Sequence, residues 1–343
     1  MKISTISIDL AKSVFQLMMF DEQHKVQQER RLSRAAFHQF IKNHPPCKVV
    51  MEACYSAHYW GRELQQLGYH VQLIPAQHVT PFVRGNKNDR NDSLAIFEAS
   101  QRPFIRPVPV KTEYQQETLM LHSIRERLTK QRIELSNQTR GLLTDFGLVF
   151  NKGHKAFFEG LTLLLDTELS ATKRFVIQQS LDDYKHLREQ QAQIETQLKH
   201  FISESSAAQI LLSLPGVGPI IASAVAASVD KAQAFKSAKD FAVWLGLTPK
   251  QSASGNRSMM GGISKRGDSY LRKQIIHGAR TLLRRAEHKP DALNQWITNL
   301  RCRKHVNCVV VAIAHRLARL MWVLLSRNSL YQAQPAQAVC TKC

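Results

Sequence analysis

Ile3-Ser-Thr-Ile-Ser-Ile-Asp9 opens the chain with alternating apolar and polar residues and ends in an acid. This alternation is typical of a half-buried β-strand. Residues 13–20 and 25–32 repeat the apolar pattern after short polar connections, so we expect three consecutive strands. Residues 34–43 then place apolar side chains at helical spacing, and Pro45-Pro46 ends that helix.

The next stretch alternates strands with helices. Lys48-Val-Val-Met-Glu52 is typical of a short buried strand, residues 57–68 of a helix, and residues 69–74 of another strand. A further helical stretch begins near Ser93. The expected order is β-β-β-α-β-α-β-α. With acids at the end of the first strand (Asp9), at the end of the fourth (Glu52) and at the start of a later helix (Asp92), this α/β domain resembles the ribonuclease-H-like fold, and within it the Holliday-junction-resolvase (RuvC-like) branch.

Four acids stand at related places in this order. Asp9 and Glu52 end two strands, and Asp89 and Asp92 lie three residues apart before a helix. Acids from strand ends and one helical face can converge on hard divalent cations, which take oxygen ligands and can flank a phosphate during in-line displacement. Taken singly, each acid also has an ordinary explanation: Asp92 as a helix N-cap, Asp9 as a turn residue, and Asp89 as part of a solvated loop.

Positive charge is concentrated at one end of the 343 residues, whose formal net charge is +20. Residues 1–110 carry 14 basic and 9 acidic side chains, residues 111–205 carry 13 of each, and residues 206–343 carry 20 and 5. Such concentration indicates a polyanion-binding surface, for which nucleic acid is the usual partner. A merely basic protein without such a surface is the alternative.

No export or membrane signal is expected. The N-terminus lacks the charged start, apolar region and cleavage site of a signal peptide. Residues 308–325 are long and apolar, but His315, Arg316 and Arg319 fall near their middle, where charge is costly in lipid. We therefore expect a cytoplasmic protein with no membrane partner.

Two groups of cysteines have spacings that also occur at zinc sites. Cys302 and Cys308 flank His305, and Cys340 and Cys343 form a pair near the C-terminus. Because the first group precedes a helix without a turn signal and the second lies in a polar tail, we expect reduced thiols without metal.

The neutral middle of the chain has the pattern of two long helices. Residues 113–146 contain a 3-4 repeat, and residues 181–203 contain a second, similar one. The first repeat consists of Leu121, Ile124, Leu128, Gln131, Leu135, Gln138 and Leu142. These helices either pack together within one chain or join subunits as a coiled coil.

The basic region begins with Leu214-Pro-Gly-Val-Gly-Pro-Ile-Ile-Ala222, which is typical of a helix-hairpin-helix. Gly216 and Gly218 would let backbone N–H groups approach a phosphate at a helix N-terminus. A tight turn between two core helices is the alternative.

Ten basic residues and two acids lie between Lys250 and Lys289. Within them, Ser254 precedes Gly255 in an expected mobile loop, where a hydroxyl contacts a phosphate, forms a turn or acts as a nucleophile. His277 is a candidate base for the serine, or else a core histidine. The expected phosphate-binding side chains are Lys250, Arg257, Lys265, Arg266, Arg272, Lys273 and Arg280.

In this order the motifs resemble the transposases of the insertion sequence 110 family, which are related to Piv-type DNA invertases. The resemblance covers nearly the whole chain. Asn88 and Ser93 depart from the family, in which Thr and Ala are common, and neither should be a ligand. The motifs are Ile8-Asp-Leu-Ala-Lys12 with Val14-Phe15, Met51-Glu-Ala-Cys54, Lys87-Asn-Asp-Arg-Asn-Asp92, Leu214-Pro-Gly-Val-Gly218, Gly246-Leu-Thr-Pro249, Ser254-Gly255, and Ile263-Ser-Lys-Arg-Gly267 with Leu271-Arg272.

The resemblance implies a RuvC-like domain over 1–110, coiled-coil helices over 111–205, and a mainly α-helical transposase domain with a helix-hairpin-helix-like element over 206–330. A flexible tail over 331–343 would follow. It also implies that Asp9, Glu52, Asp89 and Asp92 bind Mg²⁺, and that a serine forms a covalent phosphoserine link to DNA. Ser254 matches that serine best, and Ser252 is second.

The implied partners are donor and target DNA, a structured guide (bridge) RNA, and further copies of the chain in a tetramer. One subunit's acids would then act with another subunit's serine. The expected function is RNA-guided DNA recombination. The alternatives are a structure-selective nuclease that uses metal-activated water, and a non-catalytic nucleic-acid-binding scaffold.

Overall fold

The computed structural model describes residues 2–84, 88–255, 257–288 and 291–335. Lys87 of the acidic motif, the pair Cys340 and Cys343, and positions 336–343 of the expected tail lie outside the described residues. Contacts divide the chain into two compact units, Met1–Gln116 and Glu117–Cys343. The domain boundaries expected at 110 and 205 remain predictions.

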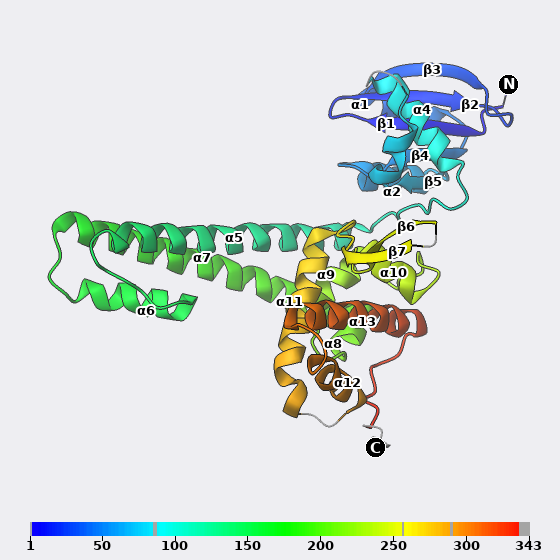
Figure 1. Cartoon of the computed structure of the whole chain (residues 1–343). Coiled ribbons are helices and arrows are strands. Elements are labelled where there is room, and N and C mark those ends of the chain that lie inside the picture. Colours follow the sequence, from blue (N-terminus) through cyan, green and yellow to red (C-terminus); the bar gives the residue numbers. More distant parts are fainter. Residues whose placement is uncertain (1, 85–87, 256, 289–290, 336–343) are drawn as a thin grey trace, which may run out of the picture. The chain divides into compact units, whose positions relative to one another are not determined.

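The first unit is built on a five-stranded sheet with the order β3-β2-β1-β4-β5 (Figure 1). Strands β1 (Thr5–Leu10), β2 (Val14–Phe20) and β3 (Val26–Ser33) are antiparallel, whereas β4 (Lys48–Glu52) and β5 (His70–Ile74) run parallel to β1. The helices are α1 (Arg34–Asn43), α2 (Ala57–Gln66), α3 (Ala76–Val79) and α4 (Asp89–Ser100), with a 3-10 turn at Thr80–Phe82. The expected mixed α/β order is confirmed, with α3 and the 3-10 turn added before α4.

Alternation along the strands gives the sheet two buried faces. On one face, Ile8 and Phe15 pack with Phe37 of α1 and Trp60 of α2. On the other face, side chains of β4 and β5 pack against α4, and Phe20 stacks on Phe97 with 3.6 Å between ring centroids. Both faces are therefore covered, and α4 is the helix that covers the face on which the acids lie.

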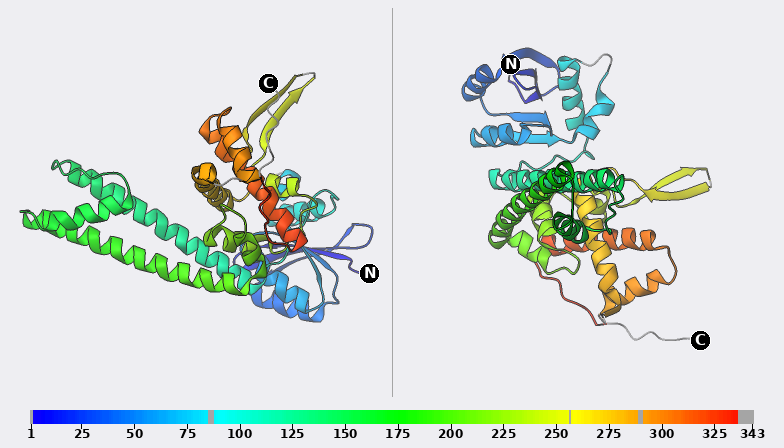
Figure 2. Two further views of the ribbon diagram at one scale, coloured as in Figure 1. Left: turned by 90° about the horizontal axis from the view of Figure 1, so that it is seen from below. Right: turned by 90° about the vertical axis from the view of Figure 1, so that its left-hand side faces the viewer.

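Two long antiparallel helices begin the second unit. They are α5 (Glu113–Thr144) and α7 (Ala171–Glu204), and α6 (His154–Leu165) lies beside them (Figures 1 and 2). Arg125 donates to Glu195 at 2.8 Å, and Thr139 Oγ1 donates to Ser180 Oγ at 3.2 Å. These pairs fix the antiparallel direction, because the residue number falls on one helix as it rises on the other.

The 3-4 repeat expected in α5 is only partly buried within this chain, and a role in joining subunits stays a prediction. Leu128 is buried, but Gln131 and Gln138 are exposed and Leu142 keeps 51% of its surface. The buried positions are instead mostly small or polar: Thr118, His122, Ser136, Thr139 and Leu143. Thr139 and Ser180 are hydrogen-bonded between α5 and α7, and counting leucines does not detect that kind of contact.

The remaining helices form one core around α13. They are α8 (Ser206–Leu212), α9 (Pro219–Val229), α10 (Ala238–Trp244), α11 (Ser269–Arg285), α12 (Ala292–Arg301) and α13 (Val306–Arg327), with a 3-10 turn at Ala286–His288. Between α10 and α11 a two-stranded hairpin, β6 (Pro249–Ser254) and β7 (Arg257–Ile263), projects from the helices (Figure 2). The mainly helical C-terminal region is confirmed.

Two glycines allow α8, α9 and α11 to meet. Gly216 has a φ of +85°, and a Cβ there would lie 3.1 Å from the carbonyl oxygen of Gly278. A Cβ on Gly278 would lie 2.3 Å from the carbonyl oxygen of Gly216. Gly216 therefore lies at a close contact between core helices, and phosphate contact by its backbone stays a prediction.

Helix α13 is long and apolar enough to cross a membrane, and no other helix of the described ranges is. Half of its most apolar window is buried in the unit. His315, Arg316 and Arg319 lie near its middle, so its apolar character reflects packing against the core.

Candidate nucleic-acid and metal site

The register of the sheet places the first two acids side by side. Ile8 of β1 pairs with Met51 of the parallel strand β4, so Asp9 and Glu52 are the next neighbours. In the same row, Asp9 pairs with Gln16 of β2, and Gln16 pairs with Arg31 of β3. Residues paired across strands point to the same face of a sheet, so this row lies on the face covered by α4.

A buried serine holds the first turn of α4 on β1 beside Asp9. Ser93 Oγ accepts a hydrogen bond from the Asp9 backbone N–H at 3.2 Å and donates to the carbonyl oxygen of Gln16 at 2.9 Å. Ser7 Oγ donates to the carbonyl oxygen of Ser93 at 2.6 Å. Ser7 and Ser93 are completely buried. Two of these bonds join α4 to β1, the strand that carries Asp9, and the third joins it to β2.

The two acids of α4 have different surroundings. Asp92 directly precedes Ser93 and is partly buried, whereas Asp89 is exposed and lies 3.9 Å from Arg31. The side chain of Asn88 caps the helix by accepting from the backbone N–H of Asn91 at 2.8 Å. Asn and Thr are both N-cap residues, so the departure at Asn88 keeps that role, and Asp92 is not the N-cap.

The four acids of the expected metal-binding set do not all lie close together. Within the described ranges, no three His, Cys, Asp or Glu side chains lie close enough together to hold a metal ion. Burial, followed by the charges of Glu52 and Asp9, raises the pKa of Cys54 to about 11, so both carboxylates act on the same thiol. Two neighbouring carboxylates suit Mg²⁺, which is commonly held by one or two carboxylates together with waters and substrate phosphates.

Ser254 lies at the end of β6, next to the turn of an exposed hairpin. Every residue of β6 is exposed, and Ser254 pairs with Arg257 of β7. Ser252 lies two residues earlier, on the same face of the hairpin. The expected loop is therefore a pair of strands, which places Arg257 directly across from Ser254.

The base of this hairpin is fixed by two glycines of the motifs. A Cβ on Gly246 would lie 2.1 Å from the carbonyl oxygen of Arg266, and one on Gly267 would lie 1.9 Å from that of Trp244. The backbone N–H of Ser264 donates to Thr248 at 2.8 Å, and that of Lys265 donates to Gly246 at 3.1 Å. The motifs at 246–249 and 263–267 are therefore the two sides of one contact.

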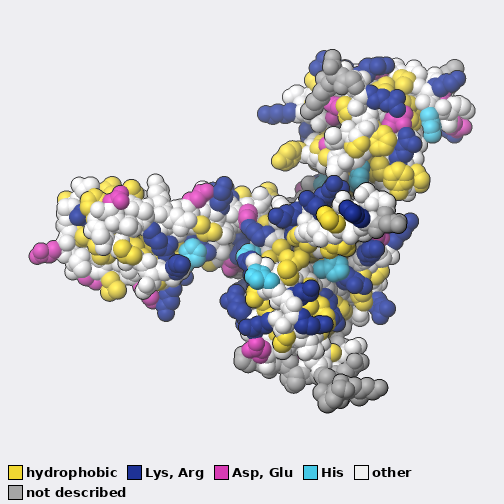
Figure 3. Space-filling model, in the orientation of Figure 1, with side chains coloured by type: hydrophobic (Ala, Val, Ile, Leu, Met, Phe, Trp, Pro, Cys, Tyr) yellow, Lys and Arg dark blue, Asp and Glu magenta, His cyan; other side chains and the backbone are white. Residues whose placement is uncertain are grey.

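The expected phosphate-binding side chains divide into two groups. Arg272 donates to the carbonyl oxygen of Leu245 at 3.2 Å, and Lys273 forms an ion pair with Glu126. The other five are exposed: Lys250, Arg257, Lys265, Arg266 and Arg280. Figure 3 shows Lys and Arg side chains gathered on this part of the second unit with hydrophobic side chains between them.

Two candidate residues differ from expectation or remain open. His277 is exposed on α11, so it is not a core histidine. Neighbouring atoms still remove part of the water around its ring, and this partial burial, followed by the charges of Arg280 and Lys273, lowers the pKa of His277. Gly218 is the N-cap of α9, and no atom lies within 4 Å of a Cβ built on it, so a role in phosphate contact stays a prediction.

Sequence reasoning missed the serine contacts around Asp9. Ser93 and Ser7 carry no motif, and a polar residue early in a helix is usually solvated. The available signal was that Ser93 directly precedes the apolar run Leu94-Ala-Ile-Phe97, whose buried members lie on the sheet side of the helix.

Comparisons with known proteins cover both units. A family model described as "Transposase IS116/IS110/IS902 family" matches residues 208–295, and a DEDD transposase model of IS110 type, described as "Transposase", matches residues 6–147. A probable family 20 transposase of Pseudomonas aeruginosa is 43% identical over 336 residues, which cover 97% of this chain and 99% of that protein. The transposase for insertion sequence element IS1111A of Coxiella burnetii is 39% identical, with 96% and 92% covered. The transposase for insertion sequence element IS1328 of Yersinia enterocolitica is 35% identical, with 96% and 98% covered. The chain therefore belongs to the IS110 family of transposases.

Proposed function

We propose that this transposase cleaves and rejoins DNA through a phosphoserine intermediate at a divalent-metal site. The observation that carries the proposal is the register of β1 and β4, which makes Asp9 and Glu52 neighbours on the face covered by α4. The sheet order, with three antiparallel strands followed by two parallel ones, supports a ribonuclease-H-like first unit.

Asp9 and Glu52 would hold Mg²⁺, and Asp92 and Asp89 would complete the set from α4. The cation would neutralise charge on the scissile phosphate. In the exchange, Ser254 Oγ forms a bond to phosphorus while a DNA oxygen leaves, and the serine proton passes to a base. A DNA hydroxyl then attacks the phosphoserine, which rejoins the strand and restores the serine. Arg257, across the hairpin from Ser254, would stabilise charge on the phosphoryl oxygens.

Guide RNA and a tetramer belong to the same proposal. A basic C-terminal region with few elements suited to reading bases supports recognition of backbone and shape, with sequence chosen by base pairing. Because the acids and Ser254 lie in different compact units, they could act together across two subunits.

The nucleophile is tested with Ser254→Ala, and Ser252→Ala is the matched control two residues away on the same strand face. We expect Ser254→Ala to abolish a denaturation-stable protein–DNA adduct while nucleic-acid binding survives, because only the attacking oxygen is removed. Adduct retained in Ser254→Ala and lost in Ser252→Ala would make Ser252 the nucleophile. Cleavage without any adduct would instead indicate a nuclease that uses water.

The metal site is tested with Asp9→Asn, which keeps the size of the side chain and removes its charge. We expect strand cleavage to fall by at least about a hundredfold, since an amide is a poor ligand for a hard cation. EDTA should abolish cleavage by the unaltered protein. Unchanged cleavage in Asp9→Asn would remove this carboxylate from the mechanism, and absence of cleavage under every condition would favour the scaffold alternative.

A further inference from the structure

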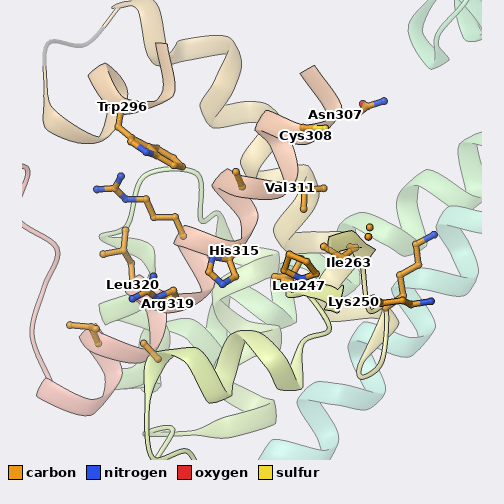
Figure 4. A pocket seen from close by; sticks show the side chains of 18 residues that line it. Leu247, Lys250, Ile263, Trp296, Asn307, Cys308, Val311, His315, Arg319 and Leu320 are labelled. Carbon is orange, nitrogen blue, oxygen red and sulfur yellow. The ribbon is translucent and has the colours of Figure 1, made fainter. Parts of the chain in front are cut away.

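A groove of about 1250 Å³ lies between α13 and the β6–β7 hairpin, entirely within the second unit (Figure 4). One wall is α13, with Val311, His315 and Arg319, and the opposite wall comes from Lys250 and Ile263 of the hairpin. In Figure 4, Trp296 of α12 and Lys250 lie at opposite ends of the lining.

The charges of this groove have one sign. Four of its lining residues are permanent cations: Lys250, Lys265, Arg316 and Arg319. No Asp or Glu belongs to the lining, all of which lies in the described part of the chain. Burial, followed by the charge of Arg319, lowers the pKa of His315, so its ring is neutral near pH 7 and can donate one hydrogen bond. Such a wall attracts a polyanion.

Apolar side chains lie among the cations of the lining and favour one form of nucleic acid. They include Leu247, Ile263, Val311 and Leu320. A duplex stacks its bases inside and presents phosphates, so it would leave these apolar side chains in contact with water. An unpaired strand exposes the faces of its bases, which bury apolar surface while the phosphates meet the cations.

One end of the groove is suited to stacking. The guanidinium of Arg316 lies 4.4 Å from the ring centroid of Trp296, in a cation–π arrangement. Bases stack on tryptophan rings and on arginine planes. An added base would extend this existing stack at low conformational cost, because Trp296 and Arg316 are already half-buried and in contact.

We propose that this groove binds an unpaired nucleic-acid strand, with its phosphates on the cations of α13 and the hairpin and a base against Trp296 and Arg316. The strand would run beside the hairpin that carries Ser254. The inference rests on the proposed nucleic-acid substrate but is independent of which residue attacks the phosphate. An acidic amphipathic protein segment would also fit an apolar groove with cations, but the stacking pair of Trp296 and Arg316 favours nucleic acid.

The test uses the full chain and a fluorescent unpaired oligonucleotide of about 12 nucleotides, within the range that such grooves cover. Binding is measured by anisotropy, in the Ser254→Ala background so that failure of the serine chemistry cannot change the result. Arg319→Glu is compared with Arg327→Glu, since both arginines are exposed on α13 and only Arg319 lines the groove. A duplex of equal length is the second probe.

We expect Arg319→Glu to weaken binding of the unpaired strand about tenfold and to lower the salt slope by about one. Arg327→Glu should change binding less than about twofold, and neither variant should lower duplex affinity as far. Photo-crosslinking of a bromouracil-bearing strand should modify the α12 peptide that contains Trp296.

Equal losses for the two variants, or for the two probes, would overturn the proposal. So would crosslinks that avoid α12. If Arg319→Glu leaves oligonucleotide binding intact but changes the sedimentation of the assembly, the groove holds a protein segment, and the proposal is wrong.

Discussion

Replacing Ser93 with Ala should loosen the first turn of α4 from β1 while the rest of the helix stays in place. The variant removes one acceptor of the Asp9 N–H, at 3.2 Å, and one donor to the Gln16 carbonyl, at 2.9 Å. Ser93 is completely buried, so water is a poor substitute. The stacked pair of Phe20 and Phe97 remains and should keep α4 on the sheet.

The magnitude follows from the hydrogen bonds that the Ser93 hydroxyl makes. A typical intramolecular hydrogen bond contributes about 0.5–1.5 kcal/mol to stability. At about 1.4 kcal/mol for each factor of ten, the Asp9 amide should exchange with solvent roughly 2 to 12 times faster for each bond lost. Hydrogen exchange measured by mass spectrometry on peptides of β1 in the full chain reports this change.

Ser7→Ala is the matched control for this measurement. Ser7 donates to the carbonyl oxygen of Ser93, which belongs to a helix and keeps its helical partner when Ser7 is lost. We therefore expect a smaller increase in exchange for Ser7→Ala. Exchange at β1 that is unchanged in Ser93→Ala, or that rises equally in both variants, would refute the role assigned to Ser93. Reduced cleavage alone would not decide the matter.

Two further predictions concern the second unit. Burial, followed by the charge of Arg125, lowers the pKa of His122 to about 4. In the unfolded chain the pKa of histidine is about 6.5, so between these two pH values the unfolded state binds more protons than the folded state. The free energy of unfolding should therefore fall by about 3 kcal/mol as the pH drops from about 6.5 to about 4. Unfolding of His122→Gln should lack this pH dependence, and an equal dependence would mean that other groups cause it. Gly267→Ala should destabilise the unit by at least about 3 kcal/mol, because the φ of +111° is strained for alanine and its Cβ would lie 1.9 Å from the Trp244 oxygen. Gly141→Ala, with nothing within 4 Å of its Cβ, should instead be neutral or stabilising in thermal unfolding.

The first unit was largely predictable because its signals are local. Apolar residues at helical spacing placed a helix at 34–43 and a buried run placed a strand at 48–52, and both match α1 and β4 residue for residue. Acids at strand ends indicated a site, since strand order brings such ends together. The prediction did not include the difference between Asp92, beside the buried Ser93, and Asp89, beside Arg31. That difference depends on how α4 is rotated on the sheet.

The second unit was less predictable because its contacts are distant in sequence and partly polar. His122 of α5 lies within hydrogen-bond distance of Tyr270 of α11 at 2.9 Å and of Ser223 of α9 at 3.0 Å. No periodicity of apolar residues reveals such a contact. The glycine motif at 214–218 suggested phosphate binding, yet the space left by Gly216 is filled by the backbone of α11. The groove beside α13 also depends on the placement of a hairpin that sequence analysis expected as a loop.

The exposed hairpin has a consequence for when the proposed chemistry can occur. A two-stranded ribbon without a hydrophobic core is only marginally ordered in water, and Ser254 lies near its turn, away from the glycine contact at its base. In the free chain its hydroxyl would sample many positions and attack slowly, because little orientation is provided in advance. Binding of a strand beside the hairpin would restrict that motion. The reactivity of the Ser254 hydroxyl would then depend on assembly with nucleic acid. An isolated protein molecule would cleave DNA that it meets by chance only slowly.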